Sequence, residues 1–81
     1  MKLAIKYFGQ LAEITECSEE EFEFSGMKIS DLREALFLKY SKLSNKDFQI
    51  AQNQVLVSDD TEITTNEIAL LPPFAGGWNY E

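Results

Sequence analysis

The chain has 81 residues, a formal net charge of −7 and 44% hydrophobic residues, which is the size and composition of one folded domain. This acidity argues against a nucleic-acid partner, because phosphate binding depends on Lys and Arg, and it favours either a basic protein partner or a merely solvated surface. No apolar run approaches the roughly 20 residues of a spanning helix, and Met1-Lys2 leads into a strand pattern, not a signal peptide, so we expect a cytoplasmic protein that does not bind membranes.

The first elements along the chain show the two-residue period of β-strands. Residues 2–8 place Leu3, Ile5 and Tyr7 on one face and Lys2, Ala4 and Lys6 on the other, and Gly9 ends the pattern. After a short irregular or helical stretch, residues 21–24 alternate glutamate with phenylalanine, and Ser25-Gly26 follows. We expect these two segments to pair as an antiparallel hairpin.

The period changes to that of a helix near Ser30. Its hydroxyl is a candidate N-cap, and Asp31 would then lie in the first turn, where the helix dipole favours a carboxylate. The pattern predicts one amphipathic helix from about residue 31 to about residue 43. The apolar stripe of this helix consists of Leu32, Leu36, Tyr40 and Leu43, whereas Phe37 and Leu38 lie outside it.

The second half of the chain predicts three more strands. Residues 49–53 and 54–57 are short β-prone segments, and residues 44–47 form the turn-rich link before them. Residues 67–71 are a continuous apolar run, which is typical of a central strand, and Pro72-Pro73 ends it because neither residue can donate to the sheet. This order of elements predicts an α+β, β-grasp (ubiquitin-like) fold. In it one main helix covers a mixed sheet, and the last strand lies parallel to the first.

Two residue types restrict the chemistry of the chain. It contains no histidine and a single cysteine, Cys17, so an internal disulfide, a Cys-His pair, a Ser-His-Asp triad and His-containing zinc sites are all excluded. We interpret Cys17 as a structural or surface thiol, and the acidic residues 59–62 as a solvated turn instead of a calcium loop. We therefore expect no metal site and no bound cofactor.

The C-terminal sequence has a geometry of its own. Pro72 and Pro73 favour an extended path away from the globule, and Gly76-Gly77 supplies backbone without side chains. Such a tail can enter a narrow tunnel in another protein and bring a main-chain carbonyl to a buried active site. A glycine-rich terminus without a role stays open as the alternative.

Three stretches of the chain together resemble a known family: Lys6-Tyr7-Phe8-Gly9, Ala51-Gln52-Asn53-Gln54, and residues 66–77 with their Pro-Pro-x-x-Gly-Gly ending. They are similar to the MoaD/ThiS family of ubiquitin-like sulfur carriers, and within it to the small subunits of molybdopterin synthase. The resemblance covers the chain up to Gly77. It implies a single sulfur-carrier domain over residues 1–77, followed by an extension over residues 78–81.

The resemblance also implies a reactive group and partners. An E1-like, ATP-using enzyme would adenylate the carboxylate of Gly77, next to Gly76, and the adenylate would become a thiocarboxylate. The tail would then enter the large synthase subunit, which holds the catalytic side chains of this sulfurtransferase, and pass sulfur to a cyclic pterin precursor in molybdenum cofactor biosynthesis. Phe8, Phe74, Pro72 and Pro73 are the implied partner-binding residues, and burial of Phe8 in the core stays open as the alternative.

Trp78-Asn79-Tyr80-Glu81 departs from the family pattern, because an amide to Trp78 leaves Gly77 without the carboxylate that is adenylated. We expect a processing peptidase to remove these four residues. The sequence leaves other functions open. They are a non-catalytic binding module that uses Trp78 and Tyr80, a carrier for thiamine synthesis or tRNA thiolation, and a protein modifier joined through Gly77.

Overall fold

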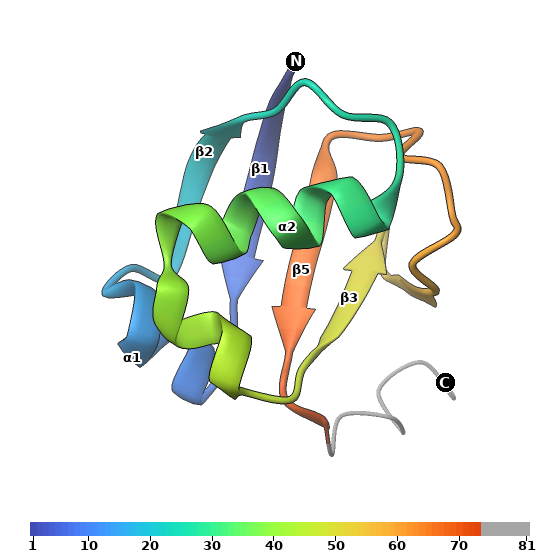
Figure 1. Cartoon of the computed structure of the whole chain (residues 1–81). Coiled ribbons are helices and arrows are strands. Elements are labelled where there is room, and N and C mark those ends of the chain that lie inside the picture. Colours follow the sequence, from blue (N-terminus) through green and yellow to red (C-terminus); the bar gives the residue numbers. More distant parts are fainter. Residues whose placement is uncertain (74–81) are drawn as a thin grey trace.

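The structure is a computed structural model that describes residues 1–73 of the chain. Five strands form one mixed sheet, and the main helix lies across one of its faces (Figure 1). The elements are β1 (Lys2–Tyr7), α1 (Gln10–Thr15), β2 (Glu19–Glu23), α2 (Ile29–Lys39), the 3₁₀ helix η1 (Ser41–Asn45), β3 (Gln49–Gln52), β4 (Val55–Val57) and β5 (Glu67–Leu71). The predicted α+β, β-grasp fold is confirmed.

The sheet places the first and last strands side by side at its centre. Its strand order is β2-β1-β5-β3-β4. β1 pairs antiparallel with β2 and parallel with β5, where Ile5 lies opposite Ile68. On its other side β5 pairs antiparallel with β3, where Ile50 lies opposite Leu70. The parallel pairing of β5 with β1 and the central position of residues 67–71 are therefore as the sequence predicts.

The hydrophobic core lies between α2 and the sheet. Leu3, Ile5 and Tyr7 are buried, whereas Lys2, Ala4 and Lys6 are exposed, as the predicted alternation requires. Leu32 and Leu36 pack against them from α2, and both side chains are fully buried. Burial of each such side chain contributes about 1.5–3 kcal/mol to folding. The face of the sheet opposite α2, called the open face below, carries the remaining residues of the strands.

The start of α2 differs from the prediction that Ser30 caps it. The N-cap is Lys28, and the side chain of Asp31 accepts a hydrogen bond from the Lys28 backbone N–H at 3.0 Å. The backbone N–H of Ser30 instead donates to the carbonyl of Asp59 at 3.0 Å, and that of Ile29 donates to Thr61 at 2.9 Å. These distant carbonyls satisfy the first N–H groups of the helix, which therefore begins two residues earlier than predicted.

The end of α2 also differs from the prediction of a helix to about residue 43. The helix ends at Lys39, and Tyr40 leaves the helical conformation with φ −126° and ψ 83°. The 3₁₀ helix η1 follows, so part of the predicted turn at residues 44–47 is helical, and Leu43 is still fully buried. Of the two residues outside the apolar stripe, Phe37 packs edge-to-face on Phe48, whereas Leu38 is 89% exposed.

β3 and β4 form the predicted pair of short strands, and they are antiparallel. Asn53 and Gln54 connect them with φ values of 53° and 69°, the left-handed pair that a two-residue hairpin loop needs. Among residues 1–73, no helix has the length and apolar character needed to cross a membrane.

Candidate functional site

The candidate site begins where the chain leaves the sheet. β5 ends at Leu71, Pro72 is half-buried and Pro73 is exposed, so the prolines end the strand as predicted. The neighbouring end of β1 is held beside this exit, because the backbone N–H of Phe8 donates to the carbonyl of Leu70 at 3.1 Å. At the foot of Figure 1, the chain leaves β5 at the same end of the sheet at which β1 ends.

Gly9 packs directly against this exit. Its φ of 61° and ψ of −136° lie in a region that essentially only glycine occupies, and an added Cβ would lie 3.0 Å from Cγ of Pro72. The two residues border an open cleft of about 520 Å³ between the start of α1, the end of η1 and the prolines. Gly9 therefore does more than end β1, since it lets the first connection approach Pro72 closely.

A shallow apolar hollow lies on the open face of the sheet. Its volume is about 170 Å³, and Ala4, Ala51 and Ala69 contribute three small side chains to its lining. Ala51 lies opposite Ala69 in the register of β3 and β5, so small residues meet at the middle of the sheet and leave the hollow there. The remaining lining residues are Lys6, Phe8, Gln54, Glu67 and Ile68.

Phe8 is the predicted site residue that the structure places most clearly at the surface. Its side chain is 42% exposed, and it lines the hollow beside the exit of the tail. Phe8 is therefore not a core residue. The alanines of the hollow are not among the predicted site residues. The signal for them was the alternation of the strands, which turns Ala4 and Ala69 away from the apolar face.

The predicted site residues divide into two groups. Phe8, Pro72 and Pro73 lie at the same end of β1 and β5, in the linings of the hollow and of the cleft. Phe74, Gly76 and Gly77 lie outside the described residues, as does the extension over residues 78–81. The structure thus describes the surface from which the tail emerges.

Gln52 holds the chain that leads into β5. Its side-chain amide donates to the carbonyl of Glu62 at 3.2 Å, and its side-chain oxygen accepts from the backbone N–H of Thr64 at 2.7 Å. Because both polar ends of this buried side chain are paired, the long loop before β5 is fixed on the end of β3. This contact gives a physical role to one residue of the Ala51-Gln52-Asn53-Gln54 stretch.

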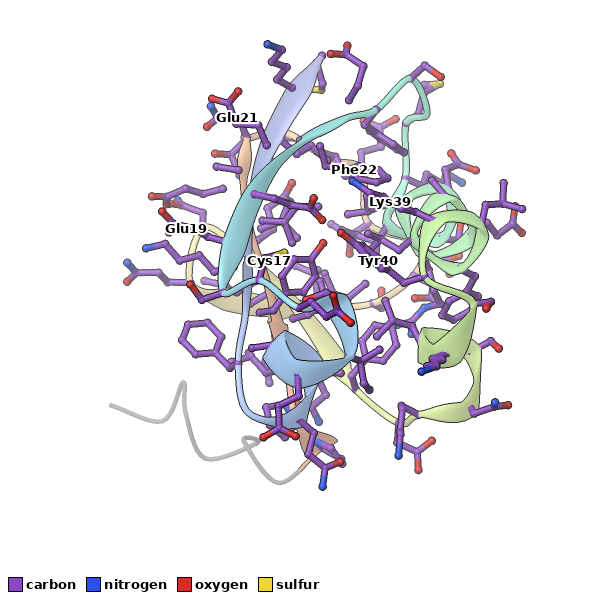
Figure 2. All side chains as sticks on the ribbon, turned by 90° about the vertical axis from the view of Figure 1, so that its left-hand side faces the viewer. Cys17, Glu19, Glu21, Phe22, Lys39 and Tyr40 are labelled. Atoms are coloured by element: carbon purple, nitrogen blue, oxygen red, sulfur yellow. The ribbon has the colours of Figure 1, made fainter. Side chains whose placement is uncertain are left out.

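A hydrogen-bonded cluster centred on Glu20 lies on the α2 side of β2, away from the hollow. Oε2 of Glu20 accepts from the hydroxyls of Tyr7 at 2.5 Å and Tyr40 at 2.7 Å, and Oε1 accepts from Nζ of Lys39 at 2.9 Å. Figure 2 shows Tyr40 and Lys39 reaching toward β2 from the end of α2. The cluster therefore ties the sheet to the end of the helix.

The pKa values in this cluster follow from its contacts. Burial, followed by the hydrogen bond to Glu20, raises the pKa of Tyr7 above its ordinary value, and the same two causes raise the pKa of Tyr40. Burial alone would raise the pKa of Glu20, but the hydrogen bonds from Tyr7, Lys39 and Tyr40 outweigh it and lower that pKa. At neutral pH Glu20 is therefore ionised, and the phenols of Tyr7 and Tyr40 are neutral.

The other groups that could take part in chemistry are the thiol of Cys17 and the acidic side chains. Cys17 is half-buried beside Thr15, with its Sγ 3.7 Å from the threonine hydroxyl, and it has no disulfide partner. Within residues 1–73, no three side chains of the types that bind metals are grouped closely enough to hold an ion. At the tail exit, the apolar hollow and the exposed ring of Phe8 form a surface suited to docking.

Comparison with known proteins adds a family and several similar structures. The model of the ThiS family matches residues 5–77. A chain from Pyrococcus furiosus, described as subunit 1 of a molybdopterin converting factor, superimposes with a TM-score of 0.82 at 27% identity, over 90% of this chain and 98% of its own.

Two further similar structures are small archaeal modifier proteins. Small archaeal modifier protein 1 of Haloferax volcanii superimposes with a TM-score of 0.75 at 20% identity, over 95% of this chain and all of its own (100%). The protein of the same name from Methanosarcina acetivorans has a TM-score of 0.69 at 24% identity, over 94% of this chain and 96% of its own. At these identities the likeness shows a shared fold.

Proposed function

This chain belongs to the ThiS family of ubiquitin-like sulfur carriers, and from that membership we propose that it is the sulfur-donating small subunit of a molybdopterin synthase. The similar chain from Pyrococcus furiosus, described as subunit 1 of a molybdopterin converting factor, supports this pathway over thiamine synthesis or tRNA thiolation. The proposal includes removal of residues 78–81, after which Gly77 carries the terminal carboxylate.

The chemistry on Gly77 has three steps, which are adenylation, formation of the thiocarboxylate and transfer of sulfur. A carboxylate is a poor acyl donor, so an E1-like partner first joins it to AMP from ATP and releases pyrophosphate. Hydrosulfide, which the partner supplies, then attacks the acyl carbon; the bond to AMP breaks, AMP leaves, and Gly77 carries a thiocarboxylate. In the synthase the thiocarboxylate sulfur attacks a carbon of the cyclic pterin precursor and displaces an oxygen substituent as its C–O bond breaks. Water then cleaves the acyl–sulfur bond, which leaves a thiol on the precursor and restores the carboxylate of Gly77.

The composition of the chain agrees with a carrier whose partners perform catalysis. It has no histidine, and its single cysteine, Cys17, is half-buried next to Thr15. The large subunit and the activating enzyme then supply the acids, bases and phosphate-binding groups. This chain contributes a tail and a surface that docks, and no cofactor is needed on it apart from the ATP that the activating partner uses.

The observation that carries the proposal is the position of the tail exit. The chain leaves β5, a strand with neighbours on both sides, through Pro72-Pro73. This exit lies beside the exposed ring of Phe8 and the apolar hollow. A partner that covers the hollow and Phe8 lies next to the first residues of the tail, so docking and tail insertion occur together. Phe74, beyond the described residues, is the remaining residue that we assign to this surface.

The first test compares the full chain with a chain that ends at Gly77. Each is incubated with ATP, a sulfur source and an E1-like activating enzyme, and intact mass is measured. We expect only the shorter chain to gain mass by exchange of one oxygen for sulfur. Equal modification of both chains, or of neither, contradicts the proposed role of Gly77 and of the removal of residues 78–81.

A second test addresses the docking surface. Phe8→Ala removes the exposed ring beside the tail, and we expect it to weaken binding to the large subunit by about 2 kcal/mol or more, as for an aromatic hot spot. Leu38→Ala is the matched control, because Leu38 is an exposed large apolar residue on α2. Calorimetric titration of both variants measures the difference. Equal affinities would remove Phe8 from the interface.

The likeness to the small archaeal modifier proteins favours a second candidate function, attachment of Gly77 to amino groups of other proteins. The same activated carboxylate serves both functions, since an amine in place of a sulfur nucleophile gives an amide. The mass of this chain does not distinguish the two functions, but the appearance of larger conjugates in a cell extract supplied with ATP does.

A further inference from the structure

The outer edge of β2 offers backbone groups to another strand. β2 is an edge strand, and within residues 1–73 it pairs only with β1. The N–H of Phe24 donates to Met1 at 2.8 Å and that of Tyr7 donates to Ser18 at 2.9 Å, so the even-numbered residues of β2 face β1. Because the direction alternates along a strand, the N–H and C=O groups of the odd-numbered residues point outward.

The residues whose backbone N–H and C=O groups point outward are Glu19, Glu21 and Glu23, and their side chains are all exposed. Nζ of Lys2 lies 3.8 Å from Glu21, and the N-terminal amine lies 3.4 Å from Glu23, but such exposed pairs are weak. A second copy pairing through this edge would bring glutamates against glutamates, which is destabilising. The edge therefore disfavours self-association, whereas a strand carrying Lys or Arg would complement its charge.

The side of the edge that faces α2 combines aromatic rings with the paired Lys39. Figure 2 shows Phe22, Lys39 and Tyr40 on the side of β2 that faces α2, with Glu19 and Glu21 on the opposite side. Nζ of Lys39 lies 5.4 Å from the ring centroid of Phe22 and 5.3 Å from that of Tyr40, and it already pairs with Glu20. The aliphatic stem of Lys39 and the half-buried ring of Tyr40 would meet every second side chain of an added strand, whereas Phe22 is buried.

We propose that the outer edge of β2 binds an extended protein segment in which basic residues alternate with aliphatic ones. The main chain of the segment pairs with Glu19, Glu21 and Glu23, its basic side chains lie along their carboxylates, and its aliphatic side chains pack toward Phe22 and Tyr40. A partner protein that contains such a segment holds the carrier by this edge.

This site is separate from the tail exit. β1 lies between β2 and β5, and residues of β2 line neither the hollow nor the cleft beside Pro72. A partner can therefore hold β2 while the tail occupies another protein. The inference does not rest on the proposed sulfur transfer, and its test uses no activating enzyme.

The test titrates the full chain with a capped peptide of alternating lysine and valine and follows backbone amide signals by NMR. We expect saturable shifts at residues 19–23, slower hydrogen exchange at Glu19, Glu21 and Glu23, and weaker binding as salt is added. A peptide of alternating glutamate and valine should not bind. Shifts elsewhere, or equal binding of the acidic peptide, overturn the proposal.

Two variants separate the backbone from the charge. Glu21→Pro and Glu21→Gln both remove one carboxylate, but only proline removes the outward N–H, which β1 does not use. We expect proline to weaken peptide binding roughly fivefold to tenfold relative to glutamine, the loss of about one hydrogen bond. Equal affinities of the two variants would overturn strand pairing at this edge.

A modified peptide applies the same test without changing the protein. N-methylation of the lysine–valine peptide at alternate residues removes the donors of one of its edges and keeps its charge. Methylation of the edge that pairs with β2 should abolish binding to the full chain, and methylation of the opposite edge should not. This comparison decides the question even if Glu21→Pro does not fold.

Discussion

Gly9 shows how one residue determines the path of the chain at the tail exit. Its positive φ lets the chain turn from β1 toward α1, and its missing Cβ lets Pro72 pack against it. The sequence marks Gly9 as the end of a strand, but it contains no sign of the contact with Pro72, which lies far along the chain. Only the parallel pairing of β1 with β5 brings them together.

Gly9→Ala should lower the free energy of unfolding by about 1–3 kcal/mol, because alanine is strained at this φ and its Cβ would crowd Pro72. Urea denaturation measures the loss. Synthetic D-alanine at the same position is the control for backbone strain, since this conformation is the mirror image of one that L-residues favour. An unchanged midpoint for the L-alanine chain would show that the turn relaxes without cost.

Tyr7 should make the protein sensitive to alkali. Its pKa is raised in the folded state, so its contribution to stability is complete below the ordinary value of 10.0 and is lost as the pH rises above it, when the unfolded chain ionises first. Tyr7→Phe should remove about 1.4 kcal/mol per pH unit from the slope of unfolding free energy in that range. Denaturation at a series of pH values tests this, and equal slopes for both proteins would contradict it.

At the scale of elements, the strands were more predictable than the ends of α2. Strands follow from alternation within a few residues, as in β1 and β5. The ends of α2 depend on distant groups, since Asp59 and Thr61 satisfy its first N–H groups and Tyr40 bonds to Glu20 on β2. Local propensity therefore suggested Ser30 as the cap, whereas tertiary contacts make Lys28 the N-cap.

The cap of α2 gives a prediction with an internal control. Asp31→Ala removes the acceptor for the N–H groups of Lys28 and Met27 and should lower the midpoint of thermal unfolding, whereas Ser30→Ala should leave it nearly unchanged. These hydrogen bonds lower the pKa of Asp31, so its contribution is lost as the pH falls through that lowered pKa. A larger effect of Ser30→Ala than of Asp31→Ala would instead support Ser30 as the N-cap of α2.

At the scale of the whole molecule, the sequence predicted the fold but not the shape of the surface around the tail exit. The fold follows from the order and period of the elements. The hollow depends on alanines from three strands, which become neighbours only through the strand order. Phe8 was a predicted docking residue whose burial in the core stayed open; in the structure it continues the side of β1 that carries Ala4 and Lys6 and lines the hollow with them.

The acidic character of the whole chain leads to a prediction about salt. With a net charge of −7, repulsion among carboxylates opposes the compact state, and added salt screens it. The thermal midpoint should therefore rise when sodium chloride is increased from low to physiological ionic strength. Differential scanning calorimetry at several concentrations checks this. A midpoint that falls would mean that screened ion pairs, such as Lys39 with Glu20, outweigh the repulsion.

The parallel pairing of β1 with β5 also determines how the domain resists mechanical force. The chain enters β1 at one end of the sheet and leaves β5 at the opposite end (Figure 1). A pull between the two ends therefore acts along both strands, across hydrogen bonds that must break together, and cannot open them one at a time. On its other side β5 is hydrogen-bonded to β3, and a pull along β5 also acts across those bonds. A protein that pulls on the tail along β5 thus acts in the direction in which the hydrogen bonds of β5 must break together.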